Sequence, residues 1–211
     1  MSIDAYLHYS APAAQAGLPL LFLFHGTGGD ERQLLSVAEE ILPHAGIVAP
    51  RGDVSEAGAA RFFRRTGEGV YDMDDLARAT EKMTGFVRAH VKAQQPGAVF
   101  GLGYSNGANI LASTIFAVPG LFDAAVLMHP LIPFAPEIAA RPFRTRLLLT
   151  AGRRDPICPS ALTERLKAHL EAAGAAVTIA WHDGGHEMRP SEIEAARTFF
   201  AAHTGGAQTH L

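Results

Sequence analysis

The chain has 211 residues, of which 48% are hydrophobic and 18% charged, a composition that predicts one folded domain with a large buried core. Its formal net charge of -3 gives no basic footprint, so we do not expect nucleic acid as a partner. Its single cysteine, Cys158, excludes an internal disulfide and any cysteine-based metal site, and gives no reason to expect an oxidising compartment.

The first half of the chain alternates between strand-like and helix-like segments. Residues 3–9 alternate apolar and polar side chains, which predicts an edge strand. Residues 20–24 are uninterrupted apolar, which is typical of a strand buried on both faces of a parallel sheet. The other elements expected here are a helix capped at Asp30 with Gln33 three residues on, a strand at 46–50, a long segment at 51–69, a helix from about Asp72 and a strand at 98–102.

The first apolar run, at 18–24, also bears on the location of the protein. It is too short to span a bilayer, and it follows neither a basic leader nor a small-residue cleavage site. We therefore expect a cytoplasmic protein without stable membrane insertion.

The second half of the chain continues the alternation. Strands are expected at 124–128, 146–150 and 177–181, with one helix carrying Leu162, Leu166 and Leu170 and a last one opening at a capping box of Ser191 and Glu194. The alternation predicts a single α/β domain over residues 1–203, in which a mostly parallel, twisted sheet is covered by helices on both faces. Residues 204–211 are expected to form a disordered tail. The ligand site of such a sheet lies at the carboxyl ends of its strands, where HGTGG, GYSNG, GRRDP and GGH all fall.

The segment GYSNG matches the pattern G-x-S-x-G, with Ser105 between Gly103 and Gly107. A serine at a sharp strand-to-helix turn is a nucleophile elbow, which exposes the hydroxyl above the sheet. We expect glycine at both flanking positions because neighbouring backbone would clash with a Cβ atom there. The pattern is common by chance, so its interpretation depends on finding a base, an acid and an oxyanion hole elsewhere in the chain.

A serine hydroxyl needs a general base, and hydrolases with this elbow place serine, acid and histidine in that chain order. His186 follows two glycines after the last expected strand, where a loop can bring an imidazole over Ser105. His129 ends the strand after the elbow and could line the pocket, but it comes early for the base. His182 reads as an ordinary strand-end residue and His169 as a surface residue of a helix. We therefore predict His186 as the base.

The acid must lie between the serine and the histidine. Asp155 directly follows the strand expected at 146–150, and Pro156 restricts it to an extended conformation. Asp123 precedes its strand and so falls at the wrong end of the sheet, and Asp183 is too close to His186 to orient it from across the sheet. We predict Asp155 as the acid, although Asp-Pro is also a common turn pair.

An oxyanion hole needs two backbone N–H groups. The first is expected from Asn106, because it follows the nucleophile at the N-terminus of a helix. The second is expected from Thr27, in the glycine-rich loop after the strand at 20–24. The alternative for that loop is a plain strand-to-helix turn.

The motifs HGTGGDE, APRG, RFFRR, GYSNGAN, GRRDPICP and GGHEM together span nearly the whole chain. With them the chain resembles an α/β-hydrolase, and more narrowly the bacterial phospholipase/carboxylesterase family, which includes the acyl-protein thioesterases. The resemblance implies a serine nucleophile with Asp and His partners, no cofactor and no metal. Dienelactone hydrolases share this fold but place cysteine at the elbow, so the serine favours an esterase. No long insertion separates the elbow unit from the acid strand, so we expect no large lid.

The function expected from these features is a serine carboxylesterase that hydrolyses short- to medium-chain esters through an acyl-enzyme. A lysophospholipase or an acyl-protein thioesterase is the alternative within enzymes, and a non-catalytic binding protein on a hydrolase scaffold is the alternative outside them. We expect a small-molecule ester as the substrate that binds. The sequence leaves open whether two chains form a homodimer.

Five further residues are candidates for substrate contact, each with a structural alternative. They are His25, Arg64, Met128, Ile157 and Met188. His25 is expected rather to brace the oxyanion loop, the arginines of 61–65 could instead pair with acids such as Glu68 and Asp72, and the three apolar residues could equally belong to the core. Cys158 could line the pocket, although a small buried hydrophobe is the preferred interpretation.

Overall fold

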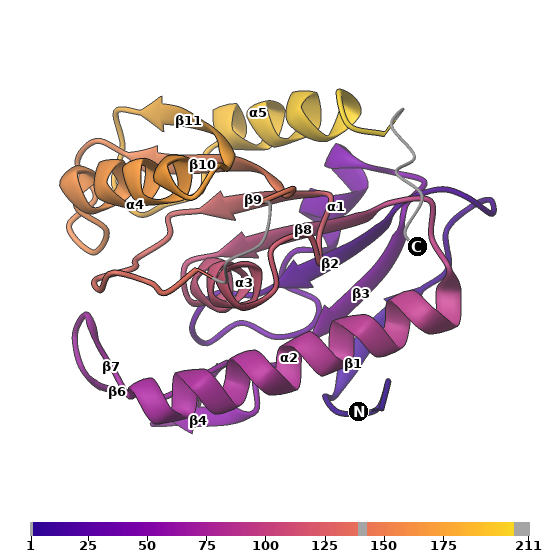
Figure 1. Ribbon diagram of the computed structural model, residues 1–211, viewed down its shortest axis with the longest axis horizontal. Helices are drawn as coiled ribbons and strands as arrows, with labels where there is room; N and C mark the ends of the chain where they lie inside the picture. The colour runs from indigo at the N-terminus through magenta and orange to yellow at the C-terminus, as the bar shows by residue number, and fades with distance from the viewer. Residues whose placement is uncertain (1, 139–142, 205–211) are drawn as a thin grey trace.

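The computed structural model describes residues 2–138 and 143–204, which fold into alternating strands and helices (Figure 1). In chain order the elements are β1 (His8–Ala11), β2 (Leu20–Phe24), α1 (Leu35–Ile41), β3 (Gly46–Pro50), β4 (Val54–Glu56), β5 (Ala59–Arg61), β6 (Arg65–Gly67), β7 (Val70–Tyr71), α2 (Met73–Gln94), β8 (Val99–Tyr104), α3 (Asn106–Ala117), β9 (Ala124–Met128), β10 (Arg146–Gly152), α4 (Ser160–Ala172), β11 (Ala176–His182) and α5 (Pro190–Ala201). The tail expected at 204–211 lies, apart from Thr204, outside the described residues.

Seven of these strands form one sheet in the order β1-β3-β2-β8-β9-β10-β11. β1 runs antiparallel to β3, and the other neighbouring strands are parallel. β2 is buried along all five of its residues, as its uninterrupted apolar run predicts. The predicted single α/β domain with a mostly parallel sheet is therefore confirmed.

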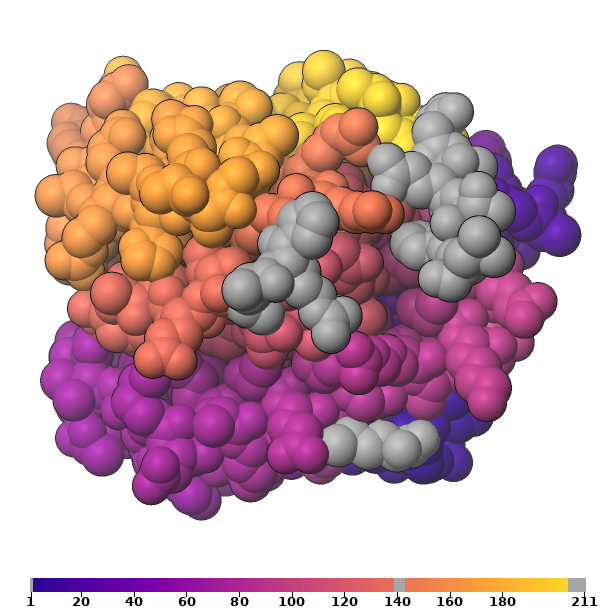
Figure 2. Space-filling model, viewed as in Figure 1, coloured from indigo at the N-terminus to yellow at the C-terminus, as the bar shows by residue number. Residues whose placement is uncertain are grey.

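Helices cover both faces of the sheet, and successive side chains of β2 serve the two cores in turn. Phe22 packs into a core with residues of α2 and α3, whereas Leu21 packs into a second core with residues of α1 and α5. Phe100 of β8 stacks on Phe200 of α5 with ring centroids 5.0 Å apart. In the space-filling view, α2 and α4 lie at the surface in front of the sheet (Figure 2).

The first strand begins later than the sequence pattern predicts. Pairing starts at His8, opposite Pro50, and the preceding residues form a turn. Tyr6 is buried and packs edge-on against Phe86, with ring centroids 5.3 Å apart, while Ile3 is 42% exposed. The alternation at 3–9 thus reflects an anchored turn followed by a short strand.

The first helix also begins later than predicted, because the expected capping residues bind elsewhere. Asp30 Oδ1 accepts the N–H of Arg32 in a local turn at 2.8 Å, and Gln33 Oε1 accepts the N–H of Gly26 at 2.8 Å. The helix starts only at Leu35. Gln33 therefore holds the glycine-rich loop instead of capping the helix.

The last helix begins earlier than predicted. Pro190 occupies its first turn, and Glu192 Oε2 accepts the N–H of Arg189 at 2.8 Å. Ser191 and Glu194 therefore lie inside the helix, and Glu194 pairs with Arg197 on its exposed side. Only the acidic half of a capping box is formed, and it uses Glu192, because the guanidinium of Arg189 cannot accept the N–H of Glu192, which donates to the backbone carbonyl of Arg189 at 2.9 Å.

The long segment at 51–69 and the residues just after it fold into two small antiparallel ribbons, β4–β5 and β6–β7. Phe62 and Phe63, between the ribbons, are fully buried and anchor the segment to the main core. This anchoring places the polar residues on either side of them beside the carboxyl end of the sheet.

The elbow between β8 and α3 has the strained geometry that its sequence predicts. Ser105 adopts φ 52° and ψ -115°, a combination rare for a residue with a side chain. A Cβ atom on Gly103 would lie 2.6 Å from the carbonyl oxygen of Gly107, and one on Gly107 would lie 1.9 Å from that of Phe24. The steric reason for both glycines is confirmed.

We expect Gly107→Ala to lower the free energy of unfolding by about 3 kcal/mol or more, because the new methyl group can only fit if backbone moves. Urea denaturation measures this change. Gly67→Ala is the matched control, since a Cβ there meets its nearest atoms at 3.8 Å, and it should change the free energy by less than about 0.5 kcal/mol. Equal stability of the two variants would contradict the packing described for the elbow.

Candidate active site

The parallel strands bring five polar residues to one edge of the sheet. Thr27 follows β2, Ser105 follows β8 and His129 follows β9, while Asp155 and His186 follow β10 and β11. Because these strands are neighbours and end at the same edge, side chains from five distant parts of the sequence meet there.

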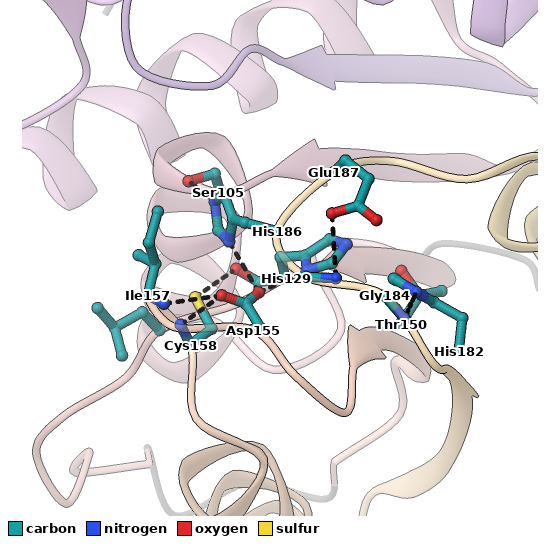
Figure 3. Close-up of polar contacts among 12 residues, drawn as sticks. Ser105, His129, Thr150, Asp155, Ile157, Cys158, His182, Gly184, His186 and Glu187 are labelled. Atoms are coloured by element: carbon teal, nitrogen blue, oxygen red, sulfur yellow. Dashed lines mark hydrogen bonds and ion pairs between the residues drawn. The ribbon is translucent and has the colours of Figure 1, made fainter.

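Ser105, His186 and Asp155 form a continuous chain of hydrogen bonds (Figure 3). His186 Nε2 lies 2.9 Å from Ser105 Oγ, and His186 Nδ1 lies 2.8 Å from Asp155 Oδ2. An ionised carboxylate only accepts, so Nδ1 carries the imidazole proton and Nε2 is free to accept the serine proton. The structure thus brings together the predicted nucleophile, base and acid in the geometry that a serine hydrolase requires.

The side chain of Asp155 is fully buried, yet its surroundings favour the charged form. Its Oδ1 accepts the N–H groups of Ile157 at 2.8 Å and Cys158 at 2.9 Å. Burial alone would raise the pKa of this carboxyl, but the amide of Cys158, the two imidazoles at Oδ2 and the amide of Ile157 together hold the pKa below its ordinary value. Asp155 is therefore a carboxylate at neutral pH.

The glycine-rich loop after β2 is fixed by a buried histidine. His25 Nε2 accepts the N–H of Gly52 at 2.9 Å, and His25 Nδ1 donates to the carbonyl of Gly26 at 2.7 Å. Burial lowers the pKa of His25, so the ring is neutral and its tautomer is set by these two bonds. The His25 side chain therefore braces the loop, which is the role expected for it as the alternative to substrate contact. It does not line the cavity beside Ser105.

The predicted oxyanion residues, Thr27 and Asn106, line the same cavity as Ser105. Thr27 is held through its hydroxyl, which accepts a 2.7 Å hydrogen bond from Arg61 Nη1. Asn106 is the first residue of α3, and its side-chain oxygen accepts the N–H of Phe62 at 2.9 Å. A first-turn amide of a helix has no partner within the helix and points toward the N-terminal end.

The cavity beside Ser105 has a volume of about 370 Å³. Its walls come from the glycine-rich loop after β2, the two ribbons, the elbow and the loops after β9, β10 and β11. The lining residues are Thr27, Arg61, Arg65, Glu68, Gly69, Tyr71, Tyr104, Ser105, Asn106, Asn109, Leu131, Ile157, Cys158 and His186. A larger groove, of about 800 Å³, lies between α2 and α3 and contains none of the residues of the hydrogen-bonded chain.

Only one of the five residues suggested for substrate contact lines this cavity. Ile157 does so and is 42% exposed. Met128 is fully buried in the second core and Met188 packs against that core, because both side chains point to the face covered by α1 and α5. Arg64 turns outward, where it pairs with Asp72 and Asp75, so it does not reach the cavity.

Arg61 and Arg65 are the arginines that border the cavity, and both have acidic partners. Arg61 lies 3.2 Å from Glu56, and Arg65 pairs with Glu56 at 3.0 Å and Glu68 at 3.1 Å. The pairing expected for this motif is therefore present, with Glu56 as a partner that the sequence did not indicate. The charges at this rim largely offset one another.

Two residues that adjoin the hydrogen-bonded chain of Ser105, His186 and Asp155 are themselves held by hydrogen bonds to the loops of that chain. Tyr104 donates its hydroxyl proton to the carbonyl of His186 at 2.7 Å. Cys158 is buried, and its Sγ donates to the carbonyl of His129 at 3.2 Å. Burial raises the pKa of the Cys158 thiol, so it is not a thiolate at neutral pH.

Three buried residues next to the chain of Ser105, His186 and Asp155 form a group that the sequence patterns did not predict. His129 contacts Asp155, Glu192 contacts His129, and His182 contacts Glu192. The available signal was the position of His129 at the carboxyl end of the strand beside the elbow. Glu192 gave no signal, because it lies on a helix whose register was predicted differently.

These histidines and carboxylates also form the two clusters of described residues whose atoms lie close enough to hold a metal ion, within 4.8 Å of one another. One is His129 with Asp155 and His186, and the other is His129 with His182 and Glu192. In both, the same atoms face one another at 2.8 to 3.3 Å.

No helix in the described part of the chain combines the length and apolarity needed to cross a bilayer.

The chain matches proteins of known family along most of its length. The model of the dienelactone hydrolase family matches residues 24–191. The chain is 38% identical over 187 residues to MhqD of Bacillus subtilis (strain 168), which is named as a putative hydrolase, and the match covers 86% of this chain and 92% of that protein.

Two solved structures extend the likeness to the whole fold. Atu2452 of Agrobacterium tumefaciens str. C58, described as a protein of unknown function, has a TM-score of 0.89 at 59% identity, covering 96% of this chain and 98% of that one. The carboxylesterase of Bacillus cereus has a TM-score of 0.86 at 36% identity, covering 93% and 94%. The match to the family model and the 38% identity to MhqD both support one conclusion. The chain belongs to the dienelactone hydrolase family of α/β-hydrolases.

Proposed function

We propose that the protein is a serine carboxylesterase that hydrolyses short- to medium-chain carboxylic esters through an acyl-enzyme. The observation that carries this proposal is the unbroken chain from Ser105 Oγ through His186 to Asp155, with the serine at the wall of an open cavity. The elbow carries serine and not cysteine, and similar structures include carboxylesterases of Bacillus cereus and, at 28% identity, Mesorhizobium loti.

In the first half of the reaction, Ser105 attacks the ester carbonyl while His186 Nε2 takes the hydroxyl proton. Asp155 stabilises the imidazolium that forms, and the amides of Thr27 and Asn106 bind the oxyanion. His186 then gives its proton to the leaving alcohol. In the second half, water attacks the acyl-enzyme by the same route and releases the acid.

The size of the cavity supports a substrate of modest size. Its volume of about 370 Å³ is at the low end of the range usual for small-molecule sites. Ile157 and Leu131 supply apolar wall, while the paired arginines and glutamate at the rim supply polar wall. Such a cavity suits a short or medium acyl chain better than the long chain of a lysophospholipid.

We expect kcat/KM for p-nitrophenyl esters to be highest for acyl chains of about two to six carbons and to fall for longer chains, because the cavity volume limits what can be buried. A series of p-nitrophenyl esters and the matching acyl thioesters measures this profile. A maximum at twelve or more carbons would favour lysophospholipase activity. Preference for thioesters would favour the thioesterase alternative, and no turnover of either class would favour a binding protein.

A further inference from the structure

His129 lies between two buried carboxylates, one of which belongs to the proposed triad. Its Nδ1 is 2.8 Å from Asp155 Oδ2, and its Nε2 is 3.1 Å from Glu192 Oε1 (Figure 3 shows His129 beside Asp155). The side chains of His129 and Asp155 are fully buried, and that of Glu192 is 2% exposed. A neutral imidazole has one N–H, so it cannot donate to both carboxylates.

The surroundings of Glu192 favour the ionised form of this carboxyl. It accepts the hydroxyl of Thr150 at 2.5 Å and the N–H of Arg189 at 2.8 Å. His182 Nδ1 accepts the N–H of Gly184 at 3.0 Å, so its proton is on Nε2, which lies 3.3 Å from Glu192 Oε2. Burial alone would raise the pKa of Glu192, but His129, Thr150 and Arg189 hold it below its ordinary value.

Both nitrogens of His129 therefore face carboxylate oxygens: Nδ1 is hydrogen-bonded to Asp155 Oδ2, and Nε2 makes an ion-pair contact with Glu192 Oε1 that lacks the alignment of a hydrogen bond. Burial alone would lower the pKa of His129, but Glu192 and Asp155 together raise it above its ordinary value. The arrangement favours an imidazolium at His129, whose charge would offset those of the two buried carboxylates beside it. Without it, Asp155 and Glu192 would be like charges buried at the same end of the sheet.

The backbone holds His129 as firmly as it holds the nucleophile. Among the described residues four non-glycine residues have positive φ, and they include His129, at 50°, and Ser105, at 52°. The N–H of His129 donates to the carbonyl of Thr150 at 2.8 Å, and its own carbonyl accepts from Cys158 Sγ at 3.2 Å. A left-handed conformation at a residue with a Cβ persists only when its surroundings impose it.

We propose that His129 is a positioning residue: it bridges Asp155 and Glu192 as a buried cation and so fixes Asp155 against His186. The inference rests on the proposed function, because it assigns a role in the same esterase reaction. Asp155 Oδ2 receives His129 Nδ1 and His186 Nδ1 at the same distance, 2.8 Å. The carboxylate is thus held from both sides, with α5 as the outer support through Glu192.

Every element packed against His129 contributes to its electrostatic environment. The titratable groups that face it are Asp155 and Cys158 from the loop after β10, Glu192 from α5, His182 from the end of β11, His186 from the loop after β11 and Tyr104 from the end of β8. The rings of His129 and His186 are 5.0 Å apart. A positive charge at His129 would therefore lie directly beside the imidazole of His186.

The test compares Glu192→Gln, His129→Asn and the double variant with Glu194→Gln as control. Glu194 is on the same helix, but its side chain is 58% exposed and pairs only with Arg197 and Thr198 among the described residues. We expect Glu192→Gln and His129→Asn each to lower kcat for the best p-nitrophenyl ester by roughly 10- to 100-fold, with KM within about twofold. The double variant should be no slower than His129→Asn alone, because both changes break one bridge.

The pH dependence of kcat/KM separates an electrostatic role of His129 from a role in packing, because loss of packing alone would not shift the acid limb. Removing the cation beside His186 favours protonation of His186, so the acid limb of kcat/KM should shift to higher pH in His129→Asn. Urea denaturation of every variant is the control that checks whether the protein is folded under the assay conditions. Additive effects in the double variant, an unmoved acid limb, or equal kcat for Glu192→Gln and Glu194→Gln would each overturn the proposal.

A second measurement needs no substrate. Protein labelled with ¹⁵N-histidine should show the His129 ring with both nitrogens protonated at pH 7, the signals being assigned by their loss in His129→Asn. A neutral His129 ring would overturn the proposal by itself. Failure of the proposed function looks different, because the wild type would then neither hydrolyse esters nor react with a fluorophosphonate, whatever the charge of His129.

Discussion

Replacing Ser105 with alanine is expected to lower kcat for a short p-nitrophenyl ester by about 10⁴-fold or more, because the variant has no atom that can form the acyl-enzyme. The fold should survive, since the serine hydroxyl contacts only His186 among the described residues and alanine keeps the Cβ atom of the elbow. Steady-state turnover measures the loss, and urea denaturation measures the retained stability.

Ser113→Ala is the matched control for this change. Ser113 lies two turns further along α3, is buried where Ser105 is partly exposed, and has a hydroxyl without a hydrogen-bond partner among the described residues. Its removal should leave kcat within about twofold of the wild type, because the substitution touches no group that the reaction uses. Turnover by Ser105→Ala at the rate of Ser113→Ala would show that Ser105 is not the nucleophile.

Replacing Asp155 with asparagine is expected to lower kcat by about 10⁴-fold, through the tautomer of His186. The amide has no charge to stabilise the imidazolium, and its N–H₂ can donate to Nδ1, which would leave the proton on the nitrogen that must accept from Ser105. Asp183→Asn is the control, because that side chain is 89% exposed and lies 3.8 Å from Arg153. A kcat for Asp155→Asn within tenfold of the control would contradict the role of Asp155.

The same variant should change the pH dependence of stability. The pKa of Asp155 is held down in the folded protein, so its contribution to stability is present above the unfolded value of about 3.9 and is lost as pH falls through the folded value. Asp155→Asn lacks this contribution. It should therefore be less stable than the wild type at pH 7, and the difference should narrow below about pH 4 in urea titrations.

The central sheet and the chain order of the site could be predicted because they follow from local patterns. The run at 20–24 is apolar at every position because β2 has a core on each face, and the glycines around Ser105 have no room for a side chain. Loop residues at the ends of parallel strands must then meet at one edge, which brought Ser105, Asp155 and His186 together before any contact was known.

The helix starts, the substrate contacts and the cluster around His129 could not be predicted, because they depend on contacts between distant segments that local patterns do not encode. Gln33 has the spacing of a helix cap, but its side-chain oxygen accepts the N–H of Gly26, seven residues earlier. Met128 borders the elbow loop in sequence, yet the alternation of side chains along β9 turns it into the second core. His129 and Glu192 are 63 positions apart, and their pairing requires both the order of β9, β10 and β11 and the true start of α5.

Covalent labelling tests most directly whether Ser105 is an activated nucleophile. A fluorophosphonate reacts with serine only where a base and an oxyanion site activate it. Intact-mass spectrometry and peptide mapping should find one label per chain, on Ser105, in wild-type protein and in Ser113→Ala, and none in Ser105→Ala. Unlabelled wild-type protein, or a label that persists in Ser105→Ala, would contradict the claim.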